Sequence, residues 1–226
     1  MDERLRRSAA HVLVADLGAP VLDEAVDHHL RRVLRLRPGD PVTVTDGAGG
    51  WRPCRLVADG LAPDGEPEHE LPPDPPVMVA AAPPKGERAE WLVQKCVEVG
   101  VDHLVLVVAE RSVVRWDGDR AVRHLDRLRR IAGEAAAQSR RVWWPTVEGP
   151  VPAADVLPAG VVAEPGGRSI GPEDHLVAVG PEGGWTEHEV AISGGSVSLG
   201  PTVLRVETAA VVATALMVAT RDRATA

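Results

Sequence analysis

The residues with the clearest chemical meaning lie at two glycine–proline pairs, Gly180-Pro181 and Gly200-Pro201. The first pair opens a glycine-rich turn, GPEGG, and free N–H groups in such a turn before a helix usually favour phosphate. This turn is neither a GxGxxG motif nor a P-loop with its lysine, and it puts Glu182 where a phosphate would sit. A carboxylate there repels a dinucleotide but suits a positively charged ligand. S-adenosylmethionine carries a sulfonium and an ammonium and no phosphate, so the turn favours a methyl donor over NAD.

Two strand-like runs and two helices must position these turns. The apolar runs Leu176–Val179 and Ser196–Leu199 each end at a glycine–proline pair. After the first pair, Thr186 and Glu189 have the spacing of a capping box, which predicts a helix directly after Thr186. After the second, Thr208–Thr220 is built almost entirely from Ala, Val, Leu and Met, which predicts a helix that is apolar all round and should therefore be buried.

Ligands of open α/β sheets bind beyond the carboxyl ends of the strands, and both turns lie at such ends. We therefore expect main-chain groups of the two turns to surround the adenosyl group, with Glu164-Pro165 nearby. The expected cofactor-binding residues are Glu164, Pro165, Val179, Gly180, Pro181, Glu182, Gly183, Gly184, Leu199, Gly200 and Leu204.

The rest of the chain divides at a proline-rich, acidic segment, Ala62–Pro76, because proline at this density prevents helix and central strand. Before it, short strands and turns surround a helix at Asp23–Leu34, which indicates a small β-barrel-like domain over residues 1–72. After it, residues 73–226 alternate strands and helices, which indicates a mostly parallel sheet covered on both faces. The strands expected there are Val77–Ala82, Leu104–Ala109, Trp143–Val147 and Val161–Glu164, and the helices are Lys85–Gly100 and Asp119–Gln138.

The turn GPEGG and the later block LGPTVLRVETAA closely resemble the RsmE-type 16S ribosomal RNA (uracil-N3)-methyltransferases of the SPOUT class. Within that block the sequence departs from the family's pattern at Thr202, where arginine is expected, and at Val206, where threonine is usual. Four more segments resemble the family in the same order: HHLRRVLRLRPGD, KGERAEWLVQKCVEVGVD, ERSVVR and QSRRVWWPTV. The matching positions in the second block are Leu199, Gly200, Leu204, Arg205, Glu207, Thr208 and Ala209.

This resemblance implies a PUA-like RNA-binding domain followed by a trefoil-knotted SPOUT domain, acting as a homodimer with the cofactor site at the dimer interface. It implies methyl transfer from S-adenosyl-L-methionine to N3 of a uridine in 16S rRNA of the small subunit. Such a reaction needs alignment, removal of the N3 proton and stabilisation of negative charge on the uracil. Our candidates for these roles are Arg205 and Glu207; the alternative is that Glu207 caps the last helix and Arg205 pairs with it or with the dimer partner.

A net charge of −8 argues mildly against nucleic acid, but basic residues are clustered near position 34, and a local patch can bind phosphate on an acidic protein. The alternative is a solvated arginine-rich helix end. We expect the cluster to contact rRNA phosphates, and two further arginines to line the catalytic side. The expected RNA-binding residues are Arg31, Arg32, Arg35 and Arg37, with Arg111 and Arg140.

Composition points to an ordinary globular protein, with 44% hydrophobic and 26% charged residues. We expect a cytoplasmic protein, because neither a signal peptide nor an apolar run long enough for a membrane is visible. The two cysteines, Cys54 and Cys96, have no metal-ligand spacing and are expected to be reduced and buried, so no metal is expected. A non-catalytic RNA-binding or ribosome assembly factor with the same fold is the main alternative, and a nucleotide-dependent oxidoreductase is a distant third.

Overall fold

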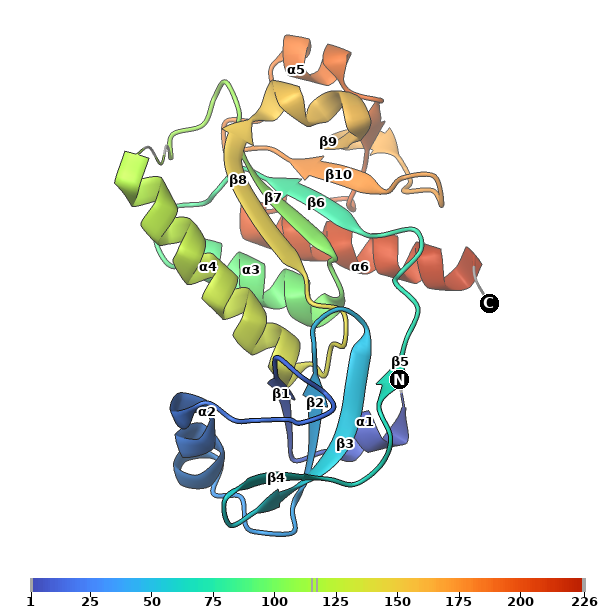
Figure 1. Cartoon of the computed structure of the whole chain (residues 1–226). Coiled ribbons are helices and arrows are strands. Elements are labelled where there is room, and N and C mark those ends of the chain that lie inside the picture. Colours follow the sequence, from blue (N-terminus) through green and yellow to red (C-terminus); the bar gives the residue numbers. More distant parts are fainter. Residues whose placement is uncertain (1, 115, 117, 225–226) are drawn as a thin grey trace. The chain divides into compact units, whose positions relative to one another are not determined.

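The computed structural model describes residues 2–114, 116 and 118–224, and these fold into two compact units, each with its own sheet (Figure 1). The first unit comprises the chain up to Pro72 together with Ala136–Trp144, and the second comprises Pro73–Ala135 and the chain from Pro145 onward.

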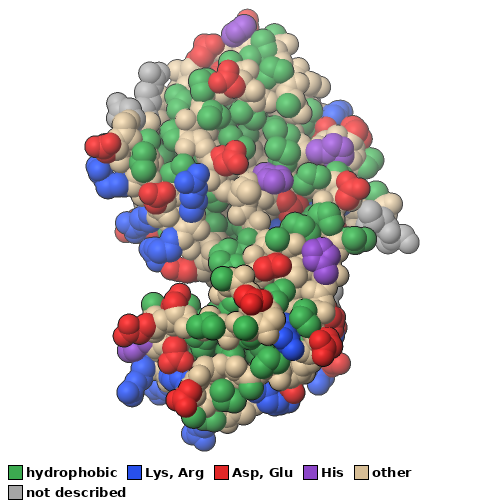
Figure 2. Space-filling model, viewed as in Figure 1, with side chains coloured by type: hydrophobic (Ala, Val, Ile, Leu, Met, Phe, Trp, Pro, Cys, Tyr) green, Lys and Arg blue, Asp and Glu red, His purple; other side chains and the backbone are tan. Residues whose placement is uncertain are grey.

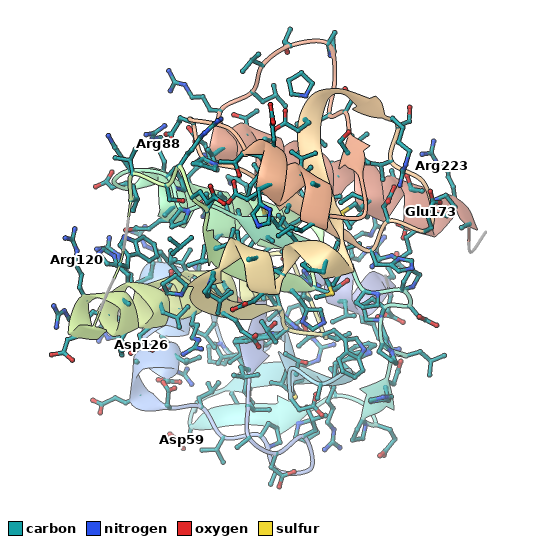
Figure 3. The ribbon with its side chains drawn as sticks, turned by 90° about the horizontal axis from the view of Figure 1, so that it is seen from above. Asp59, Arg88, Arg120, Asp126, Glu173 and Arg223 are labelled. Atoms are coloured by element: carbon teal, nitrogen blue, oxygen red, sulfur yellow. The ribbon has the colours of Figure 1, made fainter. Side chains whose placement is uncertain are left out.

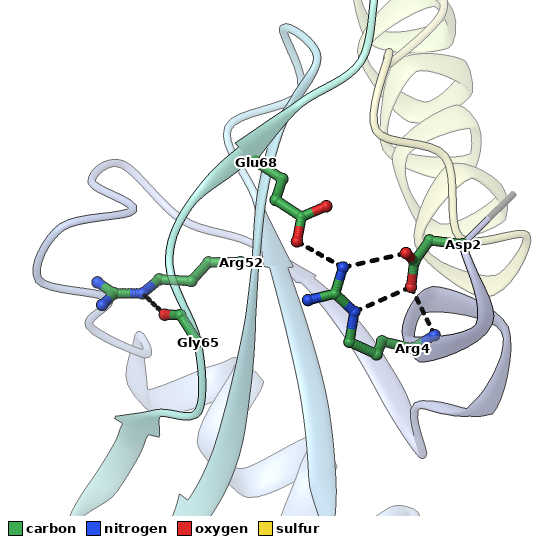
Figure 4. Close-up of polar contacts among 5 residues, drawn as sticks. All are labelled: Asp2, Arg4, Arg52, Gly65 and Glu68. Atoms are coloured by element: carbon green, nitrogen blue, oxygen red, sulfur yellow. Dashed lines mark hydrogen bonds and ion pairs between the residues drawn. The ribbon is translucent and has the colours of Figure 1, made fainter.

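The first unit is built on a five-stranded sheet in the order β1-β2-β3-β4, with β5 also pairing with β3. β1 is parallel to β2, and the other pairs are antiparallel. Arg4 lies between Asp2 and Glu68 and so ties the N-terminal helix to β5 (Figure 4). The elements are α1 (Glu3–Arg7), β1 (Ala10–Leu13), α2 (Glu24–His28), a π-helical turn (His29–Val33), β2 (Pro41–Thr45), β3 (Gly50–Val57), β4 (Gly60–Pro63) and β5 (Glu68–His69).

The second unit contains a six-stranded sheet in the order β11-β9-β10-β6-β7-β8, in which every neighbouring pair is parallel. The predicted α/β fold with a mostly parallel sheet is therefore confirmed. Its elements are β6 (Met78–Ala81), α3 (Arg88–Val99), β7 (His103–Val108), α4 (Gly118–Gln138), β8 (Thr146–Pro152), β9 (Val161–Arg168), β10 (Leu176–Val179), α5 (Glu187–Ile192), β11 (Ser196–Val197) and α6 (Val206–Ala224).

The central strand β10 is buried on both faces, as a parallel strand between two layers must be. Leu176 and Ala178 belong to a cluster that includes Leu157 of a 3-10 turn, and Val190 of α5 packs against that cluster. α6 packs against β6, β10 and the neighbouring helix α3. The sheet is thus covered by short elements in one layer and long helices in another.

The last helix matches its prediction on one side within a single copy of the chain. Ala210, Ala213 and Thr214 are fully buried, whereas the opposite side of α6 is exposed or half-buried. The reason is that α3 and the sheet cover only one side of the helix. The uncovered residues recur at helical spacing and form one stripe: Thr208, Val211, Val212, Ala215, Leu216 and Ala219.

Three strands of the second unit also differ from their predicted bounds by more than one residue. β9 continues to Arg168, four residues beyond the expected end at Glu164. The strand expected at Trp143–Val147 is β8, which begins only at Thr146, because Trp143 instead forms a bridge with Ala48 in the first unit. The strand expected at Ser196–Leu199 stops at Val197, beyond which Ser198 bonds locally with Gly200.

Both cysteines are free and buried, as the sequence predicted. Burial raises the pKa of the Cys96 thiol to about 12, so it is protonated at neutral pH.

Candidate functional site

The GPEGG turn is a tight loop that closes immediately after β10. The N–H of Gly184 donates a 2.8 Å hydrogen bond to the carbonyl of Pro181, and Gly184 has a φ of +70°, a conformation that favours glycine. At Gly180 a Cβ would lie 2.9 Å from the indole of Trp185, so the close packing of that ring requires a glycine. The loop therefore presents mainly main-chain atoms.

Arg111 braces this loop from the segment that follows β7. Its Nη1 donates to the carbonyls of Gly183 and Trp185, at 3.1 and 3.0 Å. The sequence assigned Arg111 to RNA, but in the structure this nitrogen holds the loop's backbone. Arg115, the last residue of the ERSVVR segment, lies outside the described residues.

Glu189 makes a second link between the segment that follows β7 and the segment that follows β10. The capping box expected from the sequence is present: the Thr186 N–H donates to Glu189 Oε2 at 2.9 Å, and the Glu189 N–H donates to Thr186 Oγ1 at 3.2 Å. The other oxygen, Oε1, accepts the Glu110 N–H at 2.8 Å. One buried carboxylate thus satisfies donors that follow two different strands.

The second loop, which follows β11, is held less tightly. The N–H of Ser198 donates to the Arg168 carbonyl of β9 at 2.8 Å, but beyond this bond the contacts between Ser198 and Gly200 are long, at 3.2 and 3.4 Å. Gly200 has a φ of +143°, and a Cβ there would meet nothing within 4 Å. Val203, an apolar residue in this loop, is 89% exposed.

The two loops and part of β9 enclose a cavity of about 370 Å³ at the carboxyl ends of the strands. All eleven residues that the sequence placed around a cofactor lie in its wall, so the fold gathers them as expected. Seven further residues also line the cavity. Thr202 and Val203 lie within Leu199–Leu204, whose main chain was expected to surround the cofactor, and the five that were missed are Ala163, Trp185, Ser198, Val206 and Ala209.

Trp185 is the most informative of the missed residues. It directly follows GPEGG, and that adjacency is the signal that could have identified it. The residue is 5% exposed, and its indole Nε1–H is buried without a hydrogen-bond partner among the described residues. A buried donor left unpaired is costly, so this N–H is suited to a ligand acceptor in the cavity.

The two candidate catalytic residues have very different environments. Arg205 is exposed and lies just before α6, whereas Glu207 is 7% exposed in the first turn of α6. The partner of Glu207 is Arg88, whose Nη1 lies 3.5 Å from Oε1, rather than Arg205. The other carboxylate oxygen, Oε2, is buried and has no partner among the described residues.

Arg88 was missed as a site residue because its segment, KGERAEWLVQ, indicated only a helix. It is the first residue of α3 and is labelled in Figure 3. Its side chain is 35% exposed. The Nη2 of Arg88 also lies 3.5 Å from Glu182 Oε1 in the GPEGG loop.

In the first unit, the arginine cluster divides into one engaged residue and three free ones. The Nε of Arg31 donates to Asp27 at 2.8 Å, and its Nη2 donates to the Val57 carbonyl at 2.8 Å. The other three, Arg32, Arg35 and Arg37, are exposed, and within the described part of the chain their guanidinium groups form no hydrogen bond or ion pair. Arg35 has a φ of +57°, a backbone conformation that is uncommon for residues other than glycine.

Arg140 also belongs to the first unit, in the segment that follows α4. Its Nη2 donates to the Ser8 carbonyl at 2.9 Å, and its Nη1 donates to the carbonyls of Ala137 and Gln138. Burial lowers the pKa of its guanidinium. The side chain is therefore largely occupied by main-chain acceptors, which was not expected of an RNA-binding arginine.

Charge on the visible surface is mixed: Figure 2 shows basic and acidic side chains interspersed rather than one continuous basic field. No three His, Cys, Asp or Glu side chains in the described residues are grouped as metal ligands would be. Among the described helices, none is long and apolar enough to span a bilayer.

Comparison with known proteins gives consistent results. An RNA methyltransferase domain matches residues 72–218, and an RNA methyltransferase PUA domain matches residues 22–60. The ribosomal RNA small subunit methyltransferase E of Mycobacterium tuberculosis is 35% identical, with 88% of this chain and 86% of the relative covered. The protein of the same name from Synechocystis is 36% identical, with 83% and 69% covered.

Solved structures agree. The ribosomal RNA small subunit methyltransferase E from Neisseria gonorrhoeae, bound to S-adenosyl methionine, superposes with a TM-score of 0.74 at 28% identity, covering 92% of this chain and 96% of that one. A probable rRNA-methyltransferase from Porphyromonas gingivalis gives a TM-score of 0.75 at 28% identity, with 95% and 99% covered.

Proposed function

This chain belongs to the ribosomal RNA small subunit methyltransferase E family, and on that premise we propose that it methylates N3 of a uridine in 16S rRNA with S-adenosyl-L-methionine as donor. The observation that carries the proposal is the cavity at the strand ends, whose wall includes both glycine–proline loops. We propose that it acts in the cytoplasm, on the small ribosomal subunit.

The residues present fit this cofactor. Main-chain groups of Val179–Gly184 and Leu199–Leu204 line the cavity, the free indole N–H of Trp185 offers a donor, and Glu182 suits positive charge. We propose as cofactor-binding the eleven lining residues expected from the sequence, with Trp185 added. When bound, S-adenosylmethionine supplies a methyl group on a sulfonium, whose leaving group is neutral.

The chain's own chemical contribution is proton removal and charge stabilisation. In our proposal the proton leaves uracil N3 for Glu207 Oε2, the buried oxygen that has no partner among the described residues. The electron pair stays on the ring, where the exposed guanidinium of Arg205 stabilises the charge on the uracil oxygens. Glu207 is suited to this role because its other oxygen is already engaged by Arg88.

We propose two domains with the bounds expected from the sequence, a PUA-like barrel at 1–72 and a trefoil-knotted SPOUT domain at 73–226. The PUA match to residues 22–60 and the largely antiparallel sheet support the first. The second is supported by the match of residues 72–218 to an RNA methyltransferase domain and by the six-stranded parallel sheet. The packing of Ala136–Trp144 with the first unit refines these bounds.

A homodimer is part of the proposal. The uncovered stripe of α6 is apolar over most of its length, and Val203 exposes an apolar side chain beside the cavity. Burial of this stripe against a second copy would remove apolar surface from water and complete the cover of α6.

RNA contact is proposed for the four clustered arginines and for Arg111 and Arg140. The free guanidinium groups of Arg32, Arg35 and Arg37 give the strongest support, because they have no competing partner among the described residues. Replacement of Arg32 or Arg35 by alanine should lower the slope of log affinity against log salt by about one unit each. An unchanged slope would identify them as merely solvated.

The deciding experiment uses small subunits from a strain that lacks the modification. They are incubated with the purified protein and labelled S-adenosylmethionine, and the modified nucleoside is identified by mass spectrometry after digestion. Incorporation at a single uridine N3 is expected. Cofactor binding without incorporation would favour a non-catalytic assembly factor. The observation that favours this alternative is Thr202 in the cavity wall, at a position where the family has arginine. Binding of NAD in its place would favour an oxidoreductase.

A further inference from the structure

Arg88 occupies a position where local forces do not favour it. It is the first residue of α3, and a cation at a helix N-terminus opposes the helix dipole, typically by a few tenths of a kcal/mol to about 1 kcal/mol. The preceding residue, Glu87, makes no side-chain cap bond that would compensate. A residue that violates a local rule in this way commonly serves a site.

Each of the three nitrogen atoms of the Arg88 guanidinium has an oxygen partner. Its Nε donates to the Lys85 carbonyl at 3.2 Å, which fixes the orientation of the plane. Nη2 lies 3.5 Å from Glu182 Oε1, and Nη1 lies 3.5 Å from Glu207 Oε1. One side chain therefore joins the start of α3, the GPEGG loop in the cavity wall and the start of α6.

Glu207 depends on this contact more than Glu182 does. The Glu207 side chain is 9% exposed, whereas that of Glu182 is 49% exposed and well solvated. Within residues 2–114, 116 and 118–224, Arg88 is the sole ion-pair partner of Glu207. A buried carboxylate without a counter-ion is strongly disfavoured, so removal of Arg88 would change the position of the Glu207 side chain.

We propose that Arg88 is a positioning residue for methyl transfer: it holds Glu207 by Oε1, so that Oε2 faces the uracil N3–H, and links this carboxylate to the cofactor loop through Glu182. This inference rests on the proposed function, in which Glu207 is the proton acceptor. The two distances to Arg88 and the unpartnered Oε2 are the observations that carry it.

The test compares Arg88→Met, Glu207→Gln and the double variant on small subunits that lack the modification. Methionine keeps the length of the stem and removes the charge. In saturating cofactor, Arg88→Met should lower kcat by about a hundredfold, the effect of a misplaced catalytic group. Its KM for RNA and its affinity for S-adenosylmethionine, measured by calorimetry without RNA, should each change less than threefold or so, because the solvated Glu182 keeps its place in the loop. The double variant should be no slower than Glu207→Gln, since Arg88 acts through Glu207.

Two controls keep the result interpretable. Arg127→Met removes another arginine–glutamate pair of the second unit, 2.9 Å from Glu90, and should leave kcat unchanged. Arg88→Lys keeps a charge but cannot reach both carboxylates and the Lys85 carbonyl, so its kcat should lie between those of wild type and Arg88→Met. For each variant, a thermal unfolding midpoint close to that of wild type excludes misfolding. If Arg88→Met does not fold, the kcat of Arg88→Lys tests the inference instead.

Four outcomes would overturn the inference. If the fold reductions in kcat of Arg88→Met and Glu207→Gln multiply in the double variant, Arg88 acts independently of Glu207. An increase in KM for RNA alone would make Arg88 an RNA contact, and a loss of cofactor affinity alone would assign it to the loop. A Glu207→Gln protein with normal kcat would remove the acceptor on which the inference depends. An inactive wild type would refute the proposed function itself, which is a separate result.

Discussion

The two glycine–proline loops line the same cavity but are held in opposite ways. The first, at 180–184, is braced by Arg111 and closed by an internal hydrogen bond. The second, at 200–204, has long local contacts, an open space around Gly200 and an exposed Val203.

In the proposed homodimer, this difference means that one wall of the cavity is held within the chain and the other is supported by the second copy. The uncovered apolar stripe of α6 begins five residues after Val203, which is consistent with both being covered together by a second copy. If so, changes in the first loop should act on the isolated chain, and changes near the second should act through assembly or RNA.

The largest effect is expected at the braced loop. A Cβ on Gly183 would lie 3.2 Å from Cβ of Arg111, so the branched side chain of Gly183→Val cannot be placed without moving the loop. Affinity for S-adenosylmethionine, measured by calorimetry, should fall by more than about a hundredfold, or 2.7 kcal/mol. Gly200→Ala meets no atom within 4 Å, so it adds no clash, and its cost comes only from the φ of +143°, which favours glycine; the loss of cofactor affinity should therefore be smaller. Equal losses would remove the difference between the loops.

The next effect concerns Arg205, which directly follows the second loop. Arg205→Ala should lower the methylation rate by about a hundredfold or more, as for the loss of one oxyanion donor. Cofactor affinity should change little, because Arg205 is not in the cavity wall. Normal turnover in saturating cofactor would make Arg205 structural.

Arg111→Met tests the brace itself. Loss of the two hydrogen bonds to the carbonyls of Gly183 and Trp185, at about 1 kcal/mol each, should weaken cofactor binding by about thirtyfold. The measurement is calorimetry without RNA. Unchanged cofactor affinity with weakened RNA binding would instead favour the role that the sequence assigned to Arg111.

The smallest effect is expected at the stripe of α6. Leu216 is 38% exposed, and Leu216→Ala should weaken the dimer by about fivefold, since roughly 1 kcal/mol of apolar burial is lost. Sedimentation over a range of concentrations measures the change. Val122→Ala, at another exposed apolar residue, is the control and should have no effect. A monomer at all concentrations would refute the dimer.

The braced loop was predictable because it is specified locally. A buried strand, glycines and a capping box stand next to one another in the sequence, and each has a short-range physical meaning. The eleven residues expected around the cofactor followed from the two glycine–proline turns and from the rule that ligands bind at the carboxyl ends of strands.

What depends on distant contacts was missed. Arg88 stands 94 positions before Glu182 and 119 before Glu207, and nothing in its own helix indicates which carboxylates it meets. Which side of α6 the chain itself covers could not be predicted, because composition shows that a helix can be buried, whereas the covered side depends on what surrounds it. Arg140 was assigned by charge, although its partners are carbonyls as distant as Ser8.

Glu189 has a consequence for how the cavity opens. Its two oxygens accept the N–H groups of Thr186 and Glu110, which follow different strands of the sheet. If Glu189 moves away from one of these amides, its hydrogen bond with the other is weakened as well. The segments after β7 and β10 should therefore open as one cooperative unit, and the amide hydrogens of Glu110 and Thr186 should exchange with solvent at a common free energy of opening.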